Sequence, residues 1–300
     1  MNIPTLRRLP FLLLFLGLSA LAAGEQPLLS LQPGTARPGD PVLVTVRGPR
    51  EAPTGTLGER PLRFYPVRDG FQALTGLPVE QTPGQVPVKV TVPAAGSAAP
   101  VELAGTLDVV APGWPARTLK VAGKYVKPPP EVETRMEADK AAFAAAFAQS
   151  FVPPVFGENF AWPRQGRVTA PYGDLRTFNG KKQSQHFGTD VDGAVGTPIH
   201  AANAGTVVMT RDNYASGNTV LVYHGAGLYT AYFHLSAFDV KEGQRVERGQ
   251  LLGKVGATGR VTGPHLHWGV KVDDLWVDGE TLLKLDFGTS APAVTQRDKP

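Results

Sequence analysis

Two short segments in the first third of the chain alternate apolar and polar residues with the period of a β-strand. In "PVLVTVRG" (residues 41–48) valine recurs at every second position from Val42, and "VPVKVTVPA" (residues 86–94) repeats the pattern. Turn clusters rich in Gly, Pro and Asp separate such runs, and no helical pattern lies between them. Short strands at this spacing predict a small β-sandwich of the immunoglobulin-like type over residues 24–113.

The pattern becomes helical only once. Residues 131–149 are rich in alanine, carry acidic residues early, and place Phe143 and Phe147 at helical spacing. We therefore expect one linking helix, whose two phenylalanines pack on a neighbouring domain. It belongs to a predicted β-hairpin and helix linker over residues 114–165.

Composition agrees with a mainly β protein. The chain has 300 residues, of which 42% are apolar, enough to bury a core and to suggest about two domains. Its 34 glycines and 28 prolines favour many short strands and turns. The second domain is predicted over residues 166–288, followed by a flexible tail over residues 289–300.

The N-terminus has the features of an export signal. Arg7 and Arg8 precede an apolar run, and Ala20 and Ala22 form an A-x-A arrangement. The run is shorter than the roughly 20 residues of a membrane span, so we predict a signal peptide over residues 1–23. The general secretion route fits better than the twin-arginine route, and an uncleaved anchor is the alternative. We expect a periplasmic or extracellular protein with no stable membrane insertion after cleavage.

Charge and cysteine content narrow the possible partners. The chain has 30 basic and 26 acidic residues, two of the basic ones in the signal, and no basic run with interleaved aromatic residues. This balance argues against nucleic-acid binding. The absence of cysteine excludes disulfides and lipid-modified cysteine. Oligomeric state is left open.

All six histidines lie beyond residue 165, and several have strand spacing. His186 and Asp190, four residues apart in "QHFGTDV", share one side of an extended strand, and so do His265 and His267 in "TGPHLHWGV". His234 ends the run "GLYTAYFHL". We expect these side chains to converge from three strands.

A metal site explains this convergence better than separate core histidines do. Catalytic zinc takes three protein ligands and keeps one position for water, whereas structural zinc normally has four ligands that usually include cysteine. Five candidates exceed three ligands, and the two remaining residues suit a general base and a group that stabilises developing charge.

Three segments resemble the lysostaphin/LytM family of zinc metallopeptidases, which cut peptide bonds in bacterial peptidoglycan. They are "FNGKKQSQHFGTDVDGAVGTPIHAANAGTVV", "GNTVLVYHGAGLYTAYFHLS" and "VKEGQRVERGQLLGKVGATGRVTGPHLHWGV". The resemblance covers nearly all of residues 167–277 and implies an all-β, barrel-like catalytic fold. The last segment is also similar to biotinyl or lipoyl carrier domains, but no lysine stands at a hairpin tip with the neighbours that such domains require.

The resemblance also implies roles for individual residues. His186, Asp190 and His267 correspond to the ligands of one Zn²⁺. His265 corresponds to a general base acting on the attacking water, and His234 to a residue that orients or stabilises the tetrahedral intermediate. Sequence alone does not decide which of His234 and His265 takes the proton.

Three further residues have weaker assignments. Asn179 and Tyr232 are candidates for the substrate cleft, although Tyr232 is as well explained as a core residue. His224 is a candidate for a residue that contacts one of the metal ligands, with a role in the turn at the strand end as the alternative. Trp268 faces away from His267 and is expected to pack.

The function predicted from these features is that of a secreted zinc metalloendopeptidase acting on the stem peptides or cross-links of peptidoglycan. A non-catalytic wall-binding activator of other hydrolases is the alternative, which the five intact positions disfavour. A D-Ala to diaminopimelate link, a glycine bridge and an elastin-like protein fit the same chemistry, because specificity lies in cleft loops such as residues 178–185 and 212–217. The sandwich is a spacer, a targeting module or a regulatory one.

Overall fold

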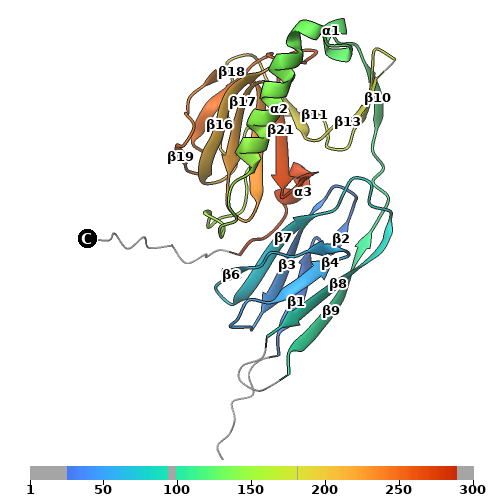
Figure 1. The fold of residues 1–300 in the computed structure, drawn as a ribbon, viewed down its shortest axis with the longest axis vertical. Helices are drawn as coiled ribbons and strands as arrows, with labels where there is room; N and C mark the ends of the chain where they lie inside the picture. Colours follow the sequence, from blue (N-terminus) through green and yellow to red (C-terminus); the bar gives the residue numbers. More distant parts are fainter. Residues whose placement is uncertain (1–25, 94–98, 181, 289–300) are drawn as a thin grey trace, which may run out of the picture.

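The computed structural model describes residues 26–93, 99–180 and 182–288, which form four β-sheets and a few helices (Figure 1). The expected mainly β class is confirmed. The predicted signal peptide and C-terminal tail lie outside the described residues. Of the helices that the structure describes, none combines the length and the apolar character needed to cross a membrane.

The N-terminal part is a sandwich of two sheets. Its alternating strand β8 buries Val86, Val88, Val90 and Val92 in the space between the sheets, as the sequence pattern predicts. The first sheet has the order β1 (Leu28–Gln32), β3 (Pro41–Arg47), β7 (Gly70–Gly76), β6 (Tyr65–Val67). The second has the order β2 (Thr35–Ala36), β9 (Val101–Val109), β8 (Gly84–Val92), β4 (Thr54–Leu57), β5 (Arg60–Pro61).

Strand β3 is buried on both of its faces, and this joins the sandwich to the rest of the molecule. Val42, Val44 and Val46 belong to the core of the sandwich, whereas Leu43 and its cross-strand partner Leu74 belong to the C-terminal core. One apolar cluster therefore extends across the junction.

Polar contacts fix the same junction. Arg60 and Arg63 of the sandwich form ion pairs with Asp274 and Asp273, which lie in the turn after β21 (His265–Val272). The amide of Asp278 donates a hydrogen bond to the Gly39 carbonyl at 2.8 Å. The sandwich is thus held rigidly against the C-terminal part, rather than being tethered to it by a linker.

The C-terminal part is built on a ten-stranded sheet in the described residues. Its two end strands, β11 and β19, pair with one neighbour each and not with one another, so the sheet is open and does not close into the expected barrel. The main path is β11 (Val168–Ala170), β14 (Thr189–Asp192), β21, β18 (Leu228–Phe238), β17 (Gly217–Tyr223), β16 (Gly205–Asn213), β19 (Arg245–Val246). Beside it lie β15 (Pro198–His200), β20 (Leu251–Val255), β22 (Leu275–Val277) and the short helix α3 (Gly279–Leu282).

The predicted β-hairpin at the start of the linker, residues 114–165, is replaced in the structure by a strand of a three-stranded sheet. Strand β10 (Ala116–Leu119) pairs in parallel with β12 (Leu175–Phe178), which in turn pairs with β13 (Lys182–Gln185). Thus the beginning of the predicted linker is a strand of the C-terminal part, and not one half of a local hairpin. The predicted boundaries between the units otherwise stay predictions.

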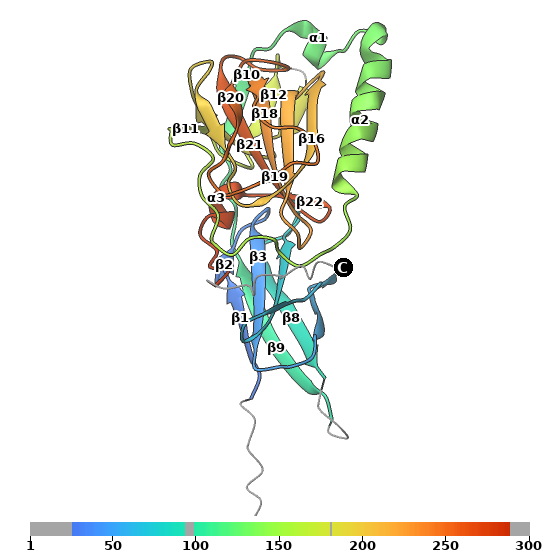
Figure 2. The ribbon, with the colours of Figure 1, turned by 90° about the vertical axis from the view of Figure 1, so that its left-hand side faces the viewer.

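The expected helix forms over α2 (Glu133–Phe147), after two short helical turns, α1 (Gly123–Val126) and η1 (Pro130–Val132). Figure 2 shows α2 along one side of the large sheet. Phe147 contacts the rings of Tyr229 and Trp276 edge to face at 5.2 and 5.7 Å between centroids. The buried carboxylate of Asp139 accepts two hydrogen bonds from the Arg211 side chain, at 3.1 and 3.0 Å. Apolar and charged contacts together hold the helix against the sheet. The packing of its phenylalanines agrees with the prediction from the sequence.

Because Phe147 packs against two aromatic rings of the sheet, the Phe147→Ala substitution is expected to lower the free energy of unfolding by about 2 kcal/mol. Met136→Ala on the same helix is the matched control, since Met136 is 38% exposed, and it should change stability by less than about 0.5 kcal/mol. Chemical denaturation of both variants measures the difference. Equal losses would show that α2 is not anchored through Phe147.

Candidate active site

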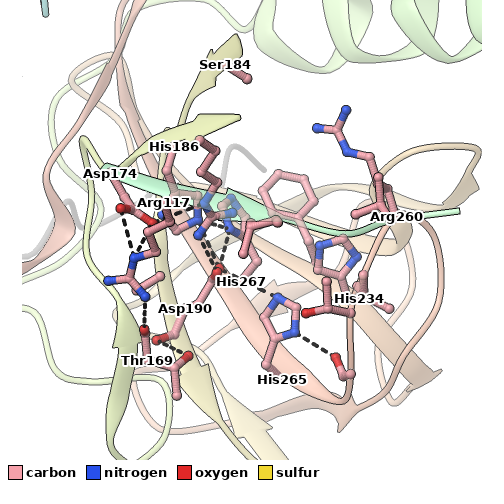
Figure 3. Close-up of a pocket in the computed structure, with 18 of the residues that line it drawn as sticks. Arg117, Thr169, Asp174, Ser184, His186, Asp190, His234, Arg260, His265 and His267 are labelled. Carbon is pink, nitrogen blue, oxygen red and sulfur yellow. Dashed lines mark hydrogen bonds and ion pairs between the residues drawn. The ribbon is translucent and has the colours of Figure 1, made fainter. Parts of the chain in front are cut away.

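The sequence-predicted histidines line one open cleft of about 490 Å³ (Figure 3). Residues from both predicted specificity loops, including Phe178, Ser184 and Ser216, lie along its walls. The cleft also includes residues of β10, such as Arg117 and Leu119, which no sequence pattern associated with the site.

Three of the predicted ligands meet atom to atom. The Nε2 of His186 lies 3.0 Å from Oδ1 of Asp190 and 2.8 Å from Nδ1 of His267. The same Nδ1 of His267 lies 2.7 Å from Oδ1 of Asp190. In the described part of the chain, this trio is the group of His and acidic residues whose ligand atoms come close enough to hold a metal ion.

Strand pairing accounts for most of this convergence. Asp190 of β14 stands directly opposite His267 of β21 in the antiparallel register, and His265 stands opposite Asp192. The prediction that a single strand contains both His186 and Asp190 is wrong, because His186 lies in the break between β13 and β14. Both side chains nevertheless reach the same point.

Gly188 makes room for this arrangement. A Cβ atom at this position would lie 2.6 Å from Nε2 of His267 and 2.7 Å from the carbonyl oxygen of Trp268. No side chain fits there without displacing the His267 ring, so the glycine between the two ligands His186 and Asp190 is a steric requirement of the site.

The donor set fits a divalent cation. The Nδ1 of His186 lies 2.8 Å from the carbonyl oxygen of Pro171, which can only accept, so His186 carries its proton there and points a lone pair from Nε2 toward the other two atoms. One proton on His267 cannot satisfy a lone pair of His186 and a carboxylate oxygen together, whereas one cation satisfies all three donors.

Two further histidines lie beside the trio and have the same tautomer as His186, with the hydrogen on Nδ1. Nδ1 of His265 is 2.9 Å from the carbonyl oxygen of Gly263, and Nδ1 of His234 is 2.8 Å from that of Thr258. Each ring therefore donates from Nδ1 to the backbone and keeps a lone pair on Nε2. Nε2 of His265 lies 3.6 Å from Oδ1 of Asp190, and the His265 and His234 rings are 5.1 Å apart between centroids.

A bulge in β18 brings His234 to this side of the sheet. Tyr232 pairs with the buried Trp268 and Phe233 pairs with His267, so strict alternation would return His234 to the core face. Instead the register between β17 and β18 shifts, and His234 adopts a positive φ of 63°. A non-glycine residue with this φ is strained by about 1 kcal/mol or more, and such strain is common at functional sites.

Burial keeps two of the site histidines, His234 and His267, neutral. Burial and the nearby His267 and His265 lower the pKa of His234 to about 3, and burial lowers the pKa of His267 to about 4 although Asp190 opposes that shift. Burial alone would raise the pKa of Asp190, but hydrogen bonds with His186 and His267 hold it well below its ordinary value. Neutral imidazoles and an ionised carboxylate are the forms that ligate metals.

Arginine and aspartate residues behind the ligands were missed by the sequence reading. Oδ1 of Asp190 faces the histidines, while its Oδ2 accepts a hydrogen bond at 2.7 Å from Nη2 of Arg176. Asp174, fully buried, accepts from Arg176 at 3.3 Å and from Arg117 of β10 at 2.9 Å. This chain of ion pairs orients the carboxylate of Asp190. The available signal was the close spacing of Asp174, just before β12, and Arg176, at its start.

The structure contradicts both candidates for substrate contact. Tyr232 is fully buried, and its hydroxyl oxygen accepts a hydrogen bond from the Ala202 amide at 2.8 Å, so it belongs to the core face that the bulge leaves behind. Asn179 is not among the residues that line the cleft, and its side chain makes two hydrogen bonds with the backbone of Val121, at 3.0 and 2.9 Å. It joins the end of β12 to the segment after β10.

His224 is likewise not a neighbour of the ligands. It is fully buried, donates from Nδ1 to the Ala204 carbonyl at 2.7 Å, and forms a second hydrogen bond of 2.8 Å between Nε2 and the Thr230 hydroxyl. Phe156 and Phe160 cover its ring. The alternative of a structural role near the end of β17 is therefore the correct one, and Trp268 packs in the core as expected.

Two histidines and one aspartate converge in an open cleft, with two more histidines beside them. This arrangement fits one class of site, a mononuclear metal centre with three protein ligands. Residues 184–279 match Peptidase family M23. A crystal structure of a peptidase M23 from Pseudomonas aeruginosa is 30% identical, with a TM-score of 0.60, over 82% of this chain and 93% of that one. The chain belongs to peptidase family M23, as its sequence motifs predict.

Two curated relatives match less than a third of the chain. The peptidoglycan DD-endopeptidase ShyA of Vibrio cholerae is 50% identical over 88 residues, which are 29% of this chain and 20% of ShyA. The glycyl-glycine endopeptidase ALE-1 of Staphylococcus capitis is 42% identical over 85 residues, 28% of this chain and 24% of ALE-1. The chain thus matches about a fifth to a quarter of the length of these relatives.

Burial lowers the pKa of His224 to about 4, so this residue should make the fold sensitive to acid. The unfolded chain binds a proton at this histidine below its ordinary pKa of about 6.5, whereas the folded chain does so only near pH 4. Its contribution to stability is complete above pH 6.5 and is lost as the pH falls toward 4. Between pH 7 and pH 5, the loss is about 2 kcal/mol.

The variant His224→Gln, which keeps a donor and an acceptor, should remove that part of the pH dependence. Denaturant unfolding at pH 5 and pH 7 gives the stability difference for each protein. If wild type and variant lose the same free energy over this interval, His224 does not titrate with a lowered pKa in the fold.

Proposed function

We propose that this protein is a zinc-dependent endopeptidase that hydrolyses peptide bonds in the stem peptides or cross-links of bacterial peptidoglycan. The observation that carries the proposal is the convergence of His186 Nε2, Asp190 Oδ1 and His267 Nδ1, with the free Nε2 atoms of His265 and His234 beside them. The peptidoglycan substrate is supported by the names of the relatives, such as ShyA.

Zinc is the metal that best suits this donor set. Two neutral imidazoles and one carboxylate are a zinc-type combination, and three protein ligands leave a position for water or substrate. When bound, zinc supplies Lewis acidity: it lowers the pKa of water and polarises a carbonyl group. His186, Asp190 and His267 would hold it, and Arg176 would keep the second oxygen of Asp190 away from it.

The two remaining histidines would divide the proton chemistry. Nε2 of His265, nearest to the ligand cluster, would accept the proton of the attacking water and return it to the departing amine. His234 is neutral and donates from Nδ1 to Thr258, so its Nε2 can only accept a hydrogen bond. It would therefore orient the water, and would stabilise an oxyanion only after taking up a proton.

One alternative function has less support. A non-catalytic activator of other wall hydrolases would not need a complete donor set, yet all five positions are present and converge. The export to the periplasm or extracellular space that such a substrate requires is proposed from the pattern of residues 1–23. No nucleic-acid partner is proposed.

The variants His265→Ala and His267→Ala should fail differently, although the two residues are identical and lie two positions apart. His267→Ala removes a ligand, so its zinc content should fall to near zero. His265→Ala should keep about one zinc per chain, and lose activity by about 10²–10⁴-fold, the range of general acid–base catalysis. Zinc content by atomic absorption, measured beside release of soluble products from purified sacculi, tests both expectations.

Exposed Lys254→Ala is the control, because Lys254 lies on β20 outside the cleft and should change neither quantity. Full hydrolytic activity in metal-free wild-type protein would contradict the proposal. So would equal loss of zinc in the two histidine variants.

A further inference from the structure

Three arginines line the cleft, and among the described residues only two of them have carboxylate partners. Arg117 pairs with Asp174 at 2.9 Å, and Arg176 pairs with Asp174 at 3.3 Å and Asp190 at 2.7 Å. The side chain of Arg260 has no ion pair or hydrogen bond with any residue that the structure describes. In Figure 3 its guanidinium is drawn above the His234 ring, and no dashed line reaches it.

The surroundings of Arg260 hold its charge in place without neutralising it. The guanidinium carbon lies 4.9 Å from the ring centroid of Phe178, a position that favours a cation over the ring. The residue is half-buried, and burial together with the neighbouring charge of Arg176 lowers its pKa. A half-buried cation next to a second cation is stabilised by a bound anion, so this point of the cleft is prepared for a negative group.

Arg260 also stands close to the reacting groups along the chain and in space. It lies in the loop between β20 and β21, which leads directly to His265, and Thr258 of the same loop accepts the hydrogen bond that fixes His234. Arg260, His234 and His265 line the same cleft. An anion held by Arg260 would therefore belong to a residue near the bond that is cut.

We infer that Arg260 binds a free carboxylate on the substrate residue that supplies the scissile nitrogen. This inference rests on the proposed function and makes its substrate class more specific. In a D-alanyl to diaminopimelate cross-link, the carbon bonded to the scissile nitrogen carries a free carboxylate. A glycine bridge has none at that position. Arg260 thus selects the diaminopimelate-type cross-link and disfavours glycine bridges, and bidentate pairing with a carboxylate is the geometry that guanidinium provides.

The test uses the full-length zinc-loaded protein and two synthetic cross-linked peptide dimers. They are identical except that the carboxylate beside the scissile nitrogen is free in one and converted to a carboxamide in the other. Wild type should cleave the free-carboxylate dimer with a kcat/KM higher by about tenfold or more, because a charge-assisted hydrogen bond is lost with the amide. Arg260→Gln should cleave both dimers at similar rates while keeping the zinc content of wild type.

Two further variants separate recognition from general effects of charge. Arg260→Lys keeps a positive charge but not the planar fork, and should retain part of the preference. Arg245→Gln is the matched control, because Arg245 is an exposed arginine on β19 at the far end of the sheet, and it should keep the full preference.

The possible outcomes separate this inference from the proposed function. Equal cleavage of the two dimers by wild type would overturn the inference and leave the endopeptidase function standing. The same holds if Arg260→Gln keeps the wild-type preference. Cleavage of neither dimer, together with no release of products from sacculi, would overturn both.

Discussion

The antiparallel pairing of Asp190 with His267 across β14 and β21 is the constraint on which the site depends. It places a carboxylate oxygen 2.7 Å from an imidazole nitrogen, and His186, in the segment between β13 and β14, completes the trio. Gly188 permits the close approach, and Arg176 occupies the second oxygen of the carboxylate. Because the ligands are held by strand register and ion pairs, the site is organised by the fold itself.

Backbone carbonyls set the chemical state of the other groups. The carbonyl oxygens of Pro171, Thr258 and Gly263 each accept a hydrogen bond from the Nδ1 of a histidine, and so leave three Nε2 lone pairs directed into one cleft. The bulge at His234 is part of the same organisation, since it turns that side chain from the core face to the cleft. Imidazoles that differ little in chemistry thus occupy different positions, which is the basis of the separate roles proposed for them.

Much of the fold and of the site could be predicted from local sequence patterns. The alternating valines of β8, the helix carrying Phe143 and Phe147, and the shared face of His265 and His267 all follow from period and propensity. Tyr232 was misplaced because alternation does not reveal a bulge, and Asn179 because its contact with Val121 joins strands far apart in sequence. The role of β10 depends on a parallel pairing with β12, which no local pattern encodes. The packing of Leu43 and Leu74 in the C-terminal core also depends on contacts between distant segments, so it could not be predicted from a local pattern.

The sandwich and α2 are joined to the site-bearing sheet by continuous packing, so the whole molecule supports one cleft. The central claim is that His186, Asp190 and His267, and not His265 or His234, hold one zinc ion. A crystal structure of the zinc-loaded protein, with anomalous diffraction collected at the zinc edge, tests it most directly. One anomalous peak is expected within about 2.2 Å of His186 Nε2, His267 Nδ1 and an Asp190 oxygen. A peak bound through His265 or His234, or no peak at the trio, would contradict it.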